Sequence, residues 1–430
     1  CGTRNPINNL LRSAAGYTFD QLHLDLDSSP TDGLTGDGHI YTLNTGAILL
    51  DTIRWDITQD AEGVALRSSI KNGRRNRVAS FRSTLQARLT ATGATAHLDF
   101  IDAKGKKGVD LGIEANMTPE GTRLHMTPLN PIIAYRRFTL NEDNYVELTR
   151  EGRVLALIDL LADDGTGLKL YSTPNEDALQ DISLSLNNIN MAELTSVMPY
   201  APQLGGLLHG DLHYMQADSA TTISTDIGIR RMTYEGTPMG DMGLNAIYFP
   251  NTDGSHHVDA VVTQNDNEIA MLAGTYWEQN GEGQIDAEAT LESLPLSLAN
   301  AFLPEGTIRL KGATSGSLTI TGRAANPLMT GSLATEGVHV LAEDYSVDLS
   351  IPDDTLRVNN SYLDLDRIEA YAAGKSPLTI DGSINFSDLD NIRLSLDLAA
   401  KKYKLIDAPQ SHTALAYGKV YVDMNARAWG

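Results

Sequence analysis

LNNINMAELTSVMP, residues 186–199, and LESLPLSLANAFLP, residues 291–304, are two copies of one pattern, offset by 105 positions (291 − 186 = 105). Their apolar positions coincide without a gap. An alternating strand pattern leads into each copy and a Gly-rich strand pattern follows it, so the internal repeat covers residues 181–216 and 290–341. A strand–helix–strand unit that occurs twice indicates an architecture built by repetition.

Most of the remaining chain alternates between apolar and polar residues. Leu22-x-Leu24-x-Leu26 and Leu85-x-Ala87-x-Leu89 are examples of this period of two, which is typical of half-buried strands. On the order of twenty such strands and almost no helix are expected, in a stack at ~4.8 Å per strand. The sequence therefore predicts an all-β fold, a curved and mostly antiparallel sheet with short inserted helices, in one elongated body over residues 1–430.

Each repeat copy predicts a short helix of about ten residues, ended by Pro199 or Pro304, since proline cannot continue a helix. Asn190 is a candidate N-cap, with Glu193 as its capping-box partner, whereas the second copy has Pro295 and Leu298 at these two positions. We expect the apolar faces of these helices to plug or cover the sheet locally. The predicted faces are Met191, Leu194, Val197 and Met198, and Leu296, Ala299, Phe302 and Leu303.

The apolar face of the predicted sheet has no run of amphipathic helices to cover it. The sheet must fold over itself as a barrel or sandwich, or else form an open trough whose apolar groove needs a ligand. Periodicity does not separate these arrangements, because both contain strands that are apolar on one side. The residues predicted to line the groove are Ile182, Leu184, Leu186, Leu208, Leu212, Ile285, Ala287, Ala289, Leu291, Leu378, Ile380, Ile384, Phe386, Leu394 and Leu396.

Composition narrows the classes of partner. The 430 residues carry a formal net charge of −22 and a pI near 4.7, which argues against nucleic acid because phosphate binding requires a basic face. The basic run from Lys71 to Arg77 contains Asn72-Gly73 and is most simply a solvated hairpin tip, with a contact to anionic headgroups as the alternative. Since charged runs usually face water, we favour the hairpin tip.

The ends of the sequence suggest a fragment of a longer chain. The single cysteine, Cys1, is followed by glycine, as at the lipid-bearing start of a lipoprotein, but the sequence also stops at Gly430 directly after an alternating run. The second observation favours a cut at both ends. No apolar run reaches the ~18 residues of a membrane span and no signal peptide is present, so an anchor is expected outside these residues.

A search for chemistry predicts a protein that is not an enzyme. His209 and His213 share one face of a strand, but their spacing suits a metal pair only on a helix, and no third ligand lies nearby in the sequence. The chain contains no nucleophile elbow, zincin motif or phosphate loop. We therefore expect no catalytic residues, no metal and no cofactor.

One segment resembles a known family. Gly322-Arg-Ala-Ala-Asn-Pro327-Leu-Met-Thr-Gly331-Ser-Leu333, after Gly316-Ser-Leu-Thr-Ile, is similar to the G-x-L-x-I-x-G-x-x-x-x-P-x-x-x-G-x-L pattern of the TamB family of translocation and assembly proteins, relatives of AsmA. The preceding helix pattern that ends at Pro304 also looks like the short inserted helix of those proteins. The resemblance is most specific over residues 181–340.

The resemblance implies a taco-like β-groove in the envelope of a Gram-negative cell. It implies that an N-terminal helix of the whole protein anchors it in the inner membrane, and that its C-terminal end meets an outer-membrane barrel of the Omp85 type. The implied work is to carry phospholipid through the periplasm and to support outer-membrane protein assembly or secretion. The anchor and the C-terminal end are not in this sequence, so membrane and barrel contacts would lie outside it.

Two functions follow for comparison. In the first, phospholipid acyl chains lie along an open apolar groove, and charged substitutions at Leu184, Ile285 or Ile380 block transport while barely changing folding. In the second, the chain is a structural or adhesive β-solenoid or β-sandwich of the cell envelope with a sealed aliphatic core. Unfolding by Ile285→Asp would favour the second.

Overall fold

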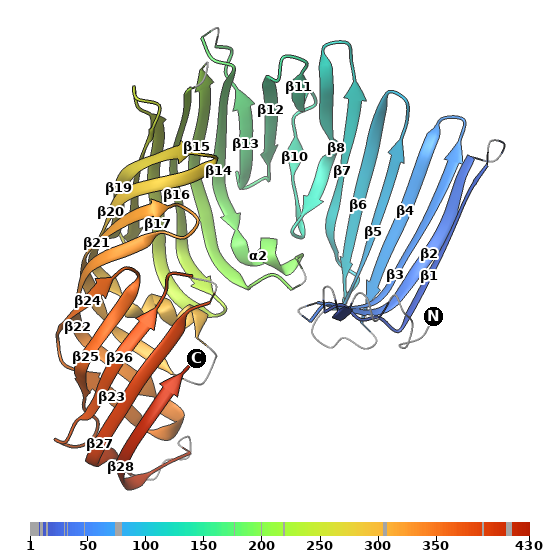
Figure 1. The fold of residues 1–430 in the computed structure, drawn as a ribbon. Helices are drawn as coiled ribbons and strands as arrows, with labels where there is room; N and C mark the ends of the chain where they lie inside the picture. The colour runs from blue at the N-terminus through green and yellow to red at the C-terminus, as the bar shows by residue number, and fades with distance from the viewer. Residues whose placement is uncertain are drawn as a thin grey trace. The chain divides into compact units, whose positions relative to one another are not determined.

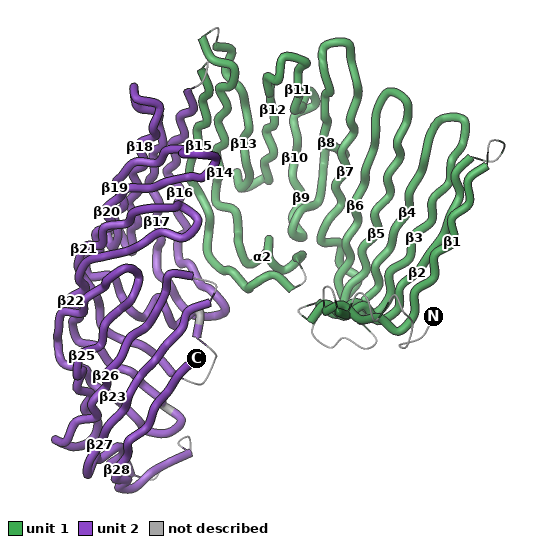
Figure 2. The backbone as a smooth tube through the Cα atoms, viewed as in Figure 1, with its two compact units in different colours: residues 1–219 green, residues 220–430 purple. Residues whose placement is uncertain are grey.

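The computed structural model describes residues 8, 12–13, 16–29, 31, 33–46, 48–73, 80–175, 177–198, 200–217, 220–303, 308–388, 391–409 and 415–430, without the side chains of Phe302 and Glu343. Within these residues the protein is all-β. Its described strands pair antiparallel in a sheet that does not close on itself (Figure 1). The predicted fold class is therefore confirmed. The chain divides into two compact units, Cys1–Ser219 and Ala220–Gly430 (Figure 2).

Unit 1, residues 1–219, contains fifteen described strands and one described helix. They are β1 (Gln21–Ser29), β2 (Gly33–Asn44), β3 (Leu49–Asp60), β4 (Gly63–Asn72), β5 (Phe81–Leu89), β6 (Gly93–Asp102), β7 (Lys107–Met117), β8 (Gly121–Ile133), β9 (Arg136–Arg137), β10 (Thr139–Leu140), β11 (Tyr145–Thr149), β12 (Val154–Leu161), β13 (Gly167–Ser172), β14 (Gln180–Asn190), α2 (Met191–Ser196) and β15 (Leu204–Ala217).

Unit 2, residues 220–430, contains thirteen described strands and two short 3₁₀ helices. They are β16 (Ala220–Tyr234), β17 (Thr237–Pro250), β18 (His256–Gln264), β19 (Asn267–Gln279), β20 (Glu282–Pro295), η1 (Leu296–Phe302), β21 (Arg309–Arg323), β22 (Leu328–Ala342), η2 (Glu343–Tyr345), β23 (Val347–Ile351), β24 (Thr355–Asn359), β25 (Tyr362–Ala370), β26 (Leu378–Asn385), β27 (Arg393–Ala408) and β28 (Gly418–Trp429).

Most strands pair with their neighbours in sequence. In unit 1 the exceptions are the pairs β8–β11 and β10–β12, which leave the two-residue strands β9 and β10 at the ends of β8 and β12. In unit 2, β22 pairs with both β23 and β24. The described residues hold 28 strands instead of about twenty, because alternation does not resolve such short strands. The apolar run Val154–Leu161 forms β12.

The register of the ladders gives the sheet of unit 1 one apolar and one polar face. Leu85 pairs with Leu98, and Leu98 with Leu111. Cross-strand partners lie on the same face, so these three leucines form one row on that face. Their neighbours in sequence, such as Gln86 and His97, pair with each other on the opposite face. The alternation in the sequence therefore separates the two faces as expected.

The same rule holds in unit 2 over many strands. Ala289 of β20 pairs with Leu318 of β21, which pairs with Gly331 of β22. Further along, Leu363 of β25 pairs with Ile384 of β26. Small and aliphatic side chains thus alternate along one face of the ladder.

The two repeat copies share a backbone irregularity. Asn188 and Ser293, which occupy the same position in the two copies, have φ of 51° and 54°. Both lie at a register shift, between Leu186 and Ile189 in β14 and between Leu291 and Leu294 in β20. A bulge of this kind bends the strand and re-aims its side chains. The inserted helices then begin at Met191 and Leu296, which are again equivalent positions.

The inserted helices are shorter than predicted. α2 spans six residues and η1 is a seven-residue 3₁₀ helix. Asn190 is the N-cap of α2 and accepts hydrogen bonds from the amides of Ala192 and Glu193, as predicted. Glu193 was expected to bond back to Asn190, but its carboxylate lies 3.5 Å from Arg136 Nε. Pro295 makes no side-chain cap, so η1 depends on packing.

Candidate functional site: the apolar face of the sheet

The apolar face of unit 1 is exposed along the middle of its strands. Leu98 of β6 keeps 38% of its surface accessible and Ile113 of β7 keeps 45%. Leu85, paired with Leu98, and Leu124 of β8 are also exposed. Singly exposed leucines are ordinary, but a contiguous apolar patch on a folded protein marks a binding surface.

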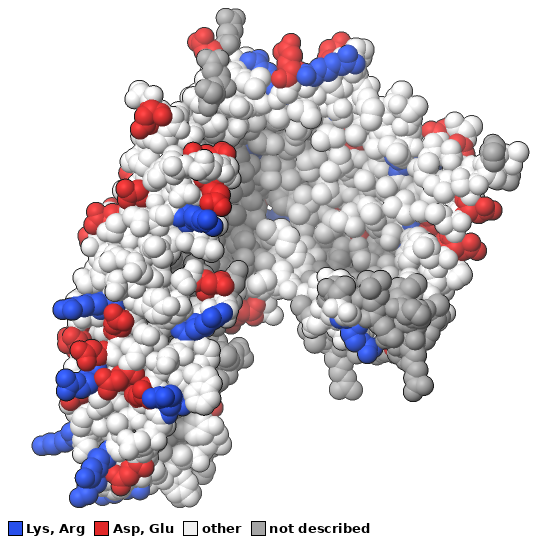
Figure 3. All heavy atoms as spheres, in the orientation of Figure 1, with Lys and Arg blue, Asp and Glu red and all other residues white. Residues whose placement is uncertain are grey.

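A space-filling view agrees with this distribution. Figure 3 shows that the face of unit 1 turned to the viewer carries almost no Lys, Arg, Asp or Glu between its strand ends. On this face the charged residues in view lie at the ends of the strands. An aliphatic ligand lying on this face would therefore desolvate few charges.

Other parts of the same face are closed. Phe138, Leu140, Ile158 and Leu160 form a buried cluster, against which Met126 and other side chains pack. Ile158 pairs with Leu170 in the ladder that continues to Leu184 and Leu212, so the cluster belongs to the apolar face. The segment that contains β9 and β10 contributes Phe138 and Leu140 to this cluster. The face of unit 1 thus has a closed region and an open region.

The predicted lining residues of unit 1 share the apolar face. Leu184 pairs with Leu212, and Leu186 and Leu208 lie on either side of the bulge at Asn188. All of them, with Ile182, are half-buried. The ladder therefore brings these five residues together on one face.

The predicted lining residues of unit 2 also share one face. The set comprises Ile285, Ala287, Ala289 and Leu291 of β20, Leu378, Ile380 and Ile384 of β26, Leu394 and Leu396 of β27, and Phe386 just beyond β26. Ala287 is buried and Leu394 is exposed, whereas the others are half-buried. Several strands of unit 2 also contain well-buried residues, Val358, Ala370 and Tyr403 among them.

The predicted helix faces are only partly covered. α2 has no buried residue, and Met198 is exposed while Met191, Leu194 and Val197 are half-buried. In η1, Leu296 and Ala299 are half-buried, as is Leu303 after it, and the side chain of Phe302 lies outside the described residues. Ala301, absent from the predicted face, is buried.

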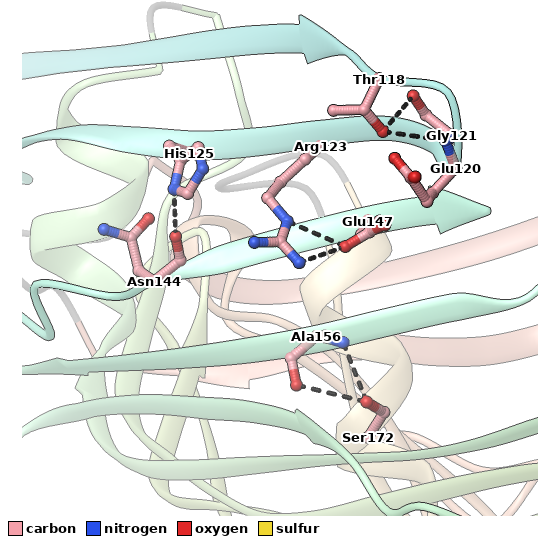
Figure 4. Close-up of polar contacts among 9 residues, drawn as sticks. All are labelled: Thr118, Glu120, Gly121, Arg123, His125, Asn144, Glu147, Ala156 and Ser172. Atoms are coloured by element: carbon pink, nitrogen blue, oxygen red, sulfur yellow. Dashed lines mark hydrogen bonds and ion pairs between the residues drawn. The ribbon is translucent and has the colours of Figure 1, made fainter.

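The polar face of unit 1 carries ordered ion pairs and hydrogen bonds. Figure 4 shows Arg123 of β8 beside Glu147 of β11, with Arg123 Nε donating to Glu147 Oε2 at 2.8 Å. His125 Nδ1 lies 2.5 Å from the carbonyl oxygen of Asn144. The buried Asn144 side chain accepts from the Met126 amide at 2.7 Å. These contacts add to the backbone ladder that joins β8 to β11.

One group on the polar face has the residue types of a metal site. His97, Asp99 and Asp110 place ligand atoms within 4.8 Å of one another. Lys107 Nζ lies 2.9 Å from Asp99 and 2.8 Å from Asp110, and this contact lowers the pKa of Asp110. The lysine ammonium thus occupies the position that a cation would take. His213 pairs with Asp181 at 2.9 Å, and His209 Nδ1 lies 3.4 Å from a backbone carbonyl.

The prediction of a solvated hairpin tip is wrong for Asn72. Asn72 ends β4 and is buried, and its side chain accepts from the Asp51 amide at 3.0 Å. Its Nδ2 donates to the hydroxyl of Tyr200 at 3.1 Å. This partner lies 128 positions away, so no local sequence pattern could have predicted it. Arg74, Arg75 and Arg77 lie outside the described residues.

Arg136 joins the closed region to α2. Its Nη1 donates to Asp164 Oδ2 at 2.6 Å, and its Nε lies 3.5 Å from Glu193. Hydrogen bonds to Asp164 lower the pKa of its carboxyl to about 2, with the largest contribution from Arg136 and a smaller one from Thr166. A carboxylate with such donors stays ionised down to strongly acidic pH.

The sequence-based list missed the open face of the first strands. Leu98 and Ile113 show the same alternation of apolar and polar residues as the predicted lining residues, so the sequence contains the pattern that marks this face. Tyr200 had no comparable signal, because its contacts with Asn72 and Leu49 join segments far apart in the chain.

No described helix is long and apolar enough to cross a membrane. Comparison with protein-family models, curated proteins and solved structures found no match to this chain.

Proposed function

We propose that this chain is a non-enzymatic carrier of phospholipid, whose acyl chains lie on the apolar face of the sheet. The observation that carries the proposal is the row of exposed aliphatic side chains in unit 1, with Leu85, Leu98 and Ile113 at its centre. Burial of each CH₂ contributes ~0.8 kcal/mol, so a two-chain lipid gains strongly from covering this row. A face without fixed charges also lets such a ligand slide.

The resemblance to the TamB family supports the cellular setting of the proposal. In that setting the chain belongs to the periplasm of a Gram-negative envelope, within a longer protein anchored in the inner membrane. Parts outside this sequence would contact an Omp85-type barrel, and the whole would support outer-membrane protein assembly or secretion. The alternative, a sealed structural solenoid, predicts buried side chains at Leu98 and Ile113, and their exposure favours the carrier.

Native mass spectrometry and organic extraction of the purified chain test the proposal. We expect co-purifying phospholipid, and at least about tenfold less of it in the double variant Leu98→Asp, Ile113→Asp, since each buried carboxylate costs several kcal/mol. Leu157→Asp is the matched control, because Leu157 is exposed but pairs with Tyr145 and Tyr171 on the polar face. Lipid-free wild-type protein, or equal loss in the control, would contradict the carrier.

A further inference from the structure

A short segment crosses from β14 to strands much earlier in unit 1. It consists of α2 with Val197, Met198 and Tyr200, and we call it the strap. The Tyr200 hydroxyl donates to the carbonyl oxygen of Leu49 at the start of β3. It also accepts from Asn72 at the end of β4. The strap therefore connects β14 to the ends of β3 and β4, more than a hundred residues away in sequence.

The Asn72 side chain is held in place for this contact. It is buried, and its two polar atoms have different partners: Oδ1 accepts from the Asp51 amide and Nδ2 donates to Tyr200. The Ser80 hydroxyl also donates to the Asn72 carbonyl at 3.3 Å. The receptor for the Tyr200 hydroxyl is thus formed by the sheet itself.

A second contact lies at Val197. A Cβ placed on Gly108 of β7 would lie 2.8 Å from Val197 Cγ1, 2.9 Å from Phe100 Cδ1 and 3.0 Å from Tyr135 Cε1. Val197 therefore packs directly on the Gly108 backbone, beside Phe100 and Tyr135. Only a residue without a side chain leaves room for this approach.

The apolar face continues to Phe100, which lies beside the contact between Val197 and Gly108. Phe81 and Phe100 are buried, and their rings stack with centroids 5.5 Å apart. Ser83 pairs with Phe100 and Leu85 with Leu98, so Phe100 is the next position on the exposed strand face. The aromatic end of the face is covered, whereas the aliphatic middle is open.

The strap has the features of a part that opens more easily than the sheet. α2 has six residues and none is buried, and helices of this length are not stable alone. Regions with few buried contacts open locally at a lower free-energy cost than the core. Loss of the Tyr200 hydrogen bonds would remove a polar attachment of the strap to β3 and β4.

We propose that the strap is a latch over a cryptic acyl-chain subsite formed by Phe81, Phe100 and Tyr135. When Tyr200 undocks, an aliphatic chain bound at Leu98 and Ile113 extends onto the aromatic end of the face. The proposal rests on the proposed lipid-carrier function and adds a second, gated part to its binding surface. A closed strap limits a ligand to the open middle.

Photolabelling with a 16-carbon fatty acid that carries a diazirine tests the subsite, with the labelled peptides mapped by mass spectrometry. The variants are Tyr200→Phe, which removes the hydroxyl alone, and Val197→Ala, which removes packing on Gly108. Tyr171→Phe on the exposed polar face is the control. Circular dichroism verifies the sheet, and hydrogen exchange of the α2 amides reports opening.

In wild type we expect label on the β5–β7 peptides at Leu85, Leu98 and Ile113, and little at Phe81 and Phe100. In Tyr200→Phe we expect about fivefold faster exchange of the α2 amides, as a typical hydrogen bond contributes a factor of two to ten. Label at Phe81 and Phe100 should rise at least about threefold by the same argument, with Val197→Ala behaving alike and the control unchanged.

The outcomes separate this proposal from the one on which it rests. Absence of label from the open middle in wild type would contradict the carrier function itself. Label in the open middle, together with unchanged exchange of α2 in both variants, would overturn the latch. Faster exchange without added label at Phe81 and Phe100 would overturn the subsite and leave the carrier intact.

Discussion

Two regions of one face in unit 1 have opposite environments. Leu160 lies in the closed cluster with 4% of its surface accessible, whereas Leu98 lies in the open middle with 38%. Both are leucines of alternating strands, and the register puts both on the apolar face. The difference comes from their neighbours, since Leu160 packs in a cluster with Phe138, Ile158 and its ladder partner Leu140. An apolar strand position is therefore part of a core only where bulky apolar neighbours pack around it.

The largest expected effect on stability comes from placing a carboxylate in the closed cluster, compared with the same change in the open middle. Leu160→Asp should lower the free energy of unfolding by more than about 4 kcal/mol, because it buries a carboxylate without a partner. Leu98→Asp should lower it by less than about 1 kcal/mol, since its carboxylate remains hydrated. The midpoint of urea denaturation, followed by circular dichroism, measures both. Equal destabilisation would show that the open middle is also core.

Unit 2 offers the same comparison within one strand. Ala287 is buried against Gly274, where an added Cβ would lie 2.3 Å from the Ala287 Cβ, while Ile285 is half-buried. Ala287→Asp should therefore cost about 2–4 kcal/mol, and Ile285→Asp about 1 kcal/mol. The same denaturation measurement applies. A larger loss in Ile285→Asp would support a sealed core in this unit.

The comparison of buried and exposed apolar residues also shows how much of the fold could be predicted from the sequence. Alternation predicted the strands and the two faces, because these depend on local periodicity. The residue type of Asn190 before the helix pattern predicted the N-cap, because capping depends on local hydrogen bonds. Alternation could not say that Leu160 is buried and Leu98 exposed, because burial depends on which residues the β9–β10 segment brings beside β12. The contact of Tyr200 with Asn72 was equally hidden, since it depends on the curvature of many strands.

A smaller effect is expected at a polar atom in a closed region. Tyr403 of β27 has 2% of its surface accessible, and its hydroxyl has no described partner. Burial raises the pKa of this phenol. Tyr403→Phe removes an unsatisfied polar group and should leave stability unchanged or raise it by up to about 1 kcal/mol. A thermal melt of both proteins decides this, and a clear loss would indicate a partner for the hydroxyl.

The smallest effect concerns the ion pair beside the closed region. The folded-state pKa of Asp164 is about 2, below its usual 3.8, because Arg136 donates to it. Its stabilising contribution is therefore present above pH 4 and is lost as the pH falls towards 2. The stability difference between wild type and Asp164→Asn should shrink between pH 5 and pH 2 in denaturation experiments. A difference that is constant with pH would show that the pair contributes nothing.

Thiol accessibility with and without lipid tests the central claim most directly. In a Cys1→Ser background, Leu98→Cys and Leu160→Cys report the open and closed regions through their rates of reaction with a water-soluble maleimide. We expect fast modification of Leu98→Cys that slows at least about tenfold with a short-chain phospholipid, as bound acyl chains exclude water. Leu160→Cys should react slowly in both conditions. Slow reaction of Leu98→Cys without lipid, or no protection by lipid, would contradict an open lipid-binding face.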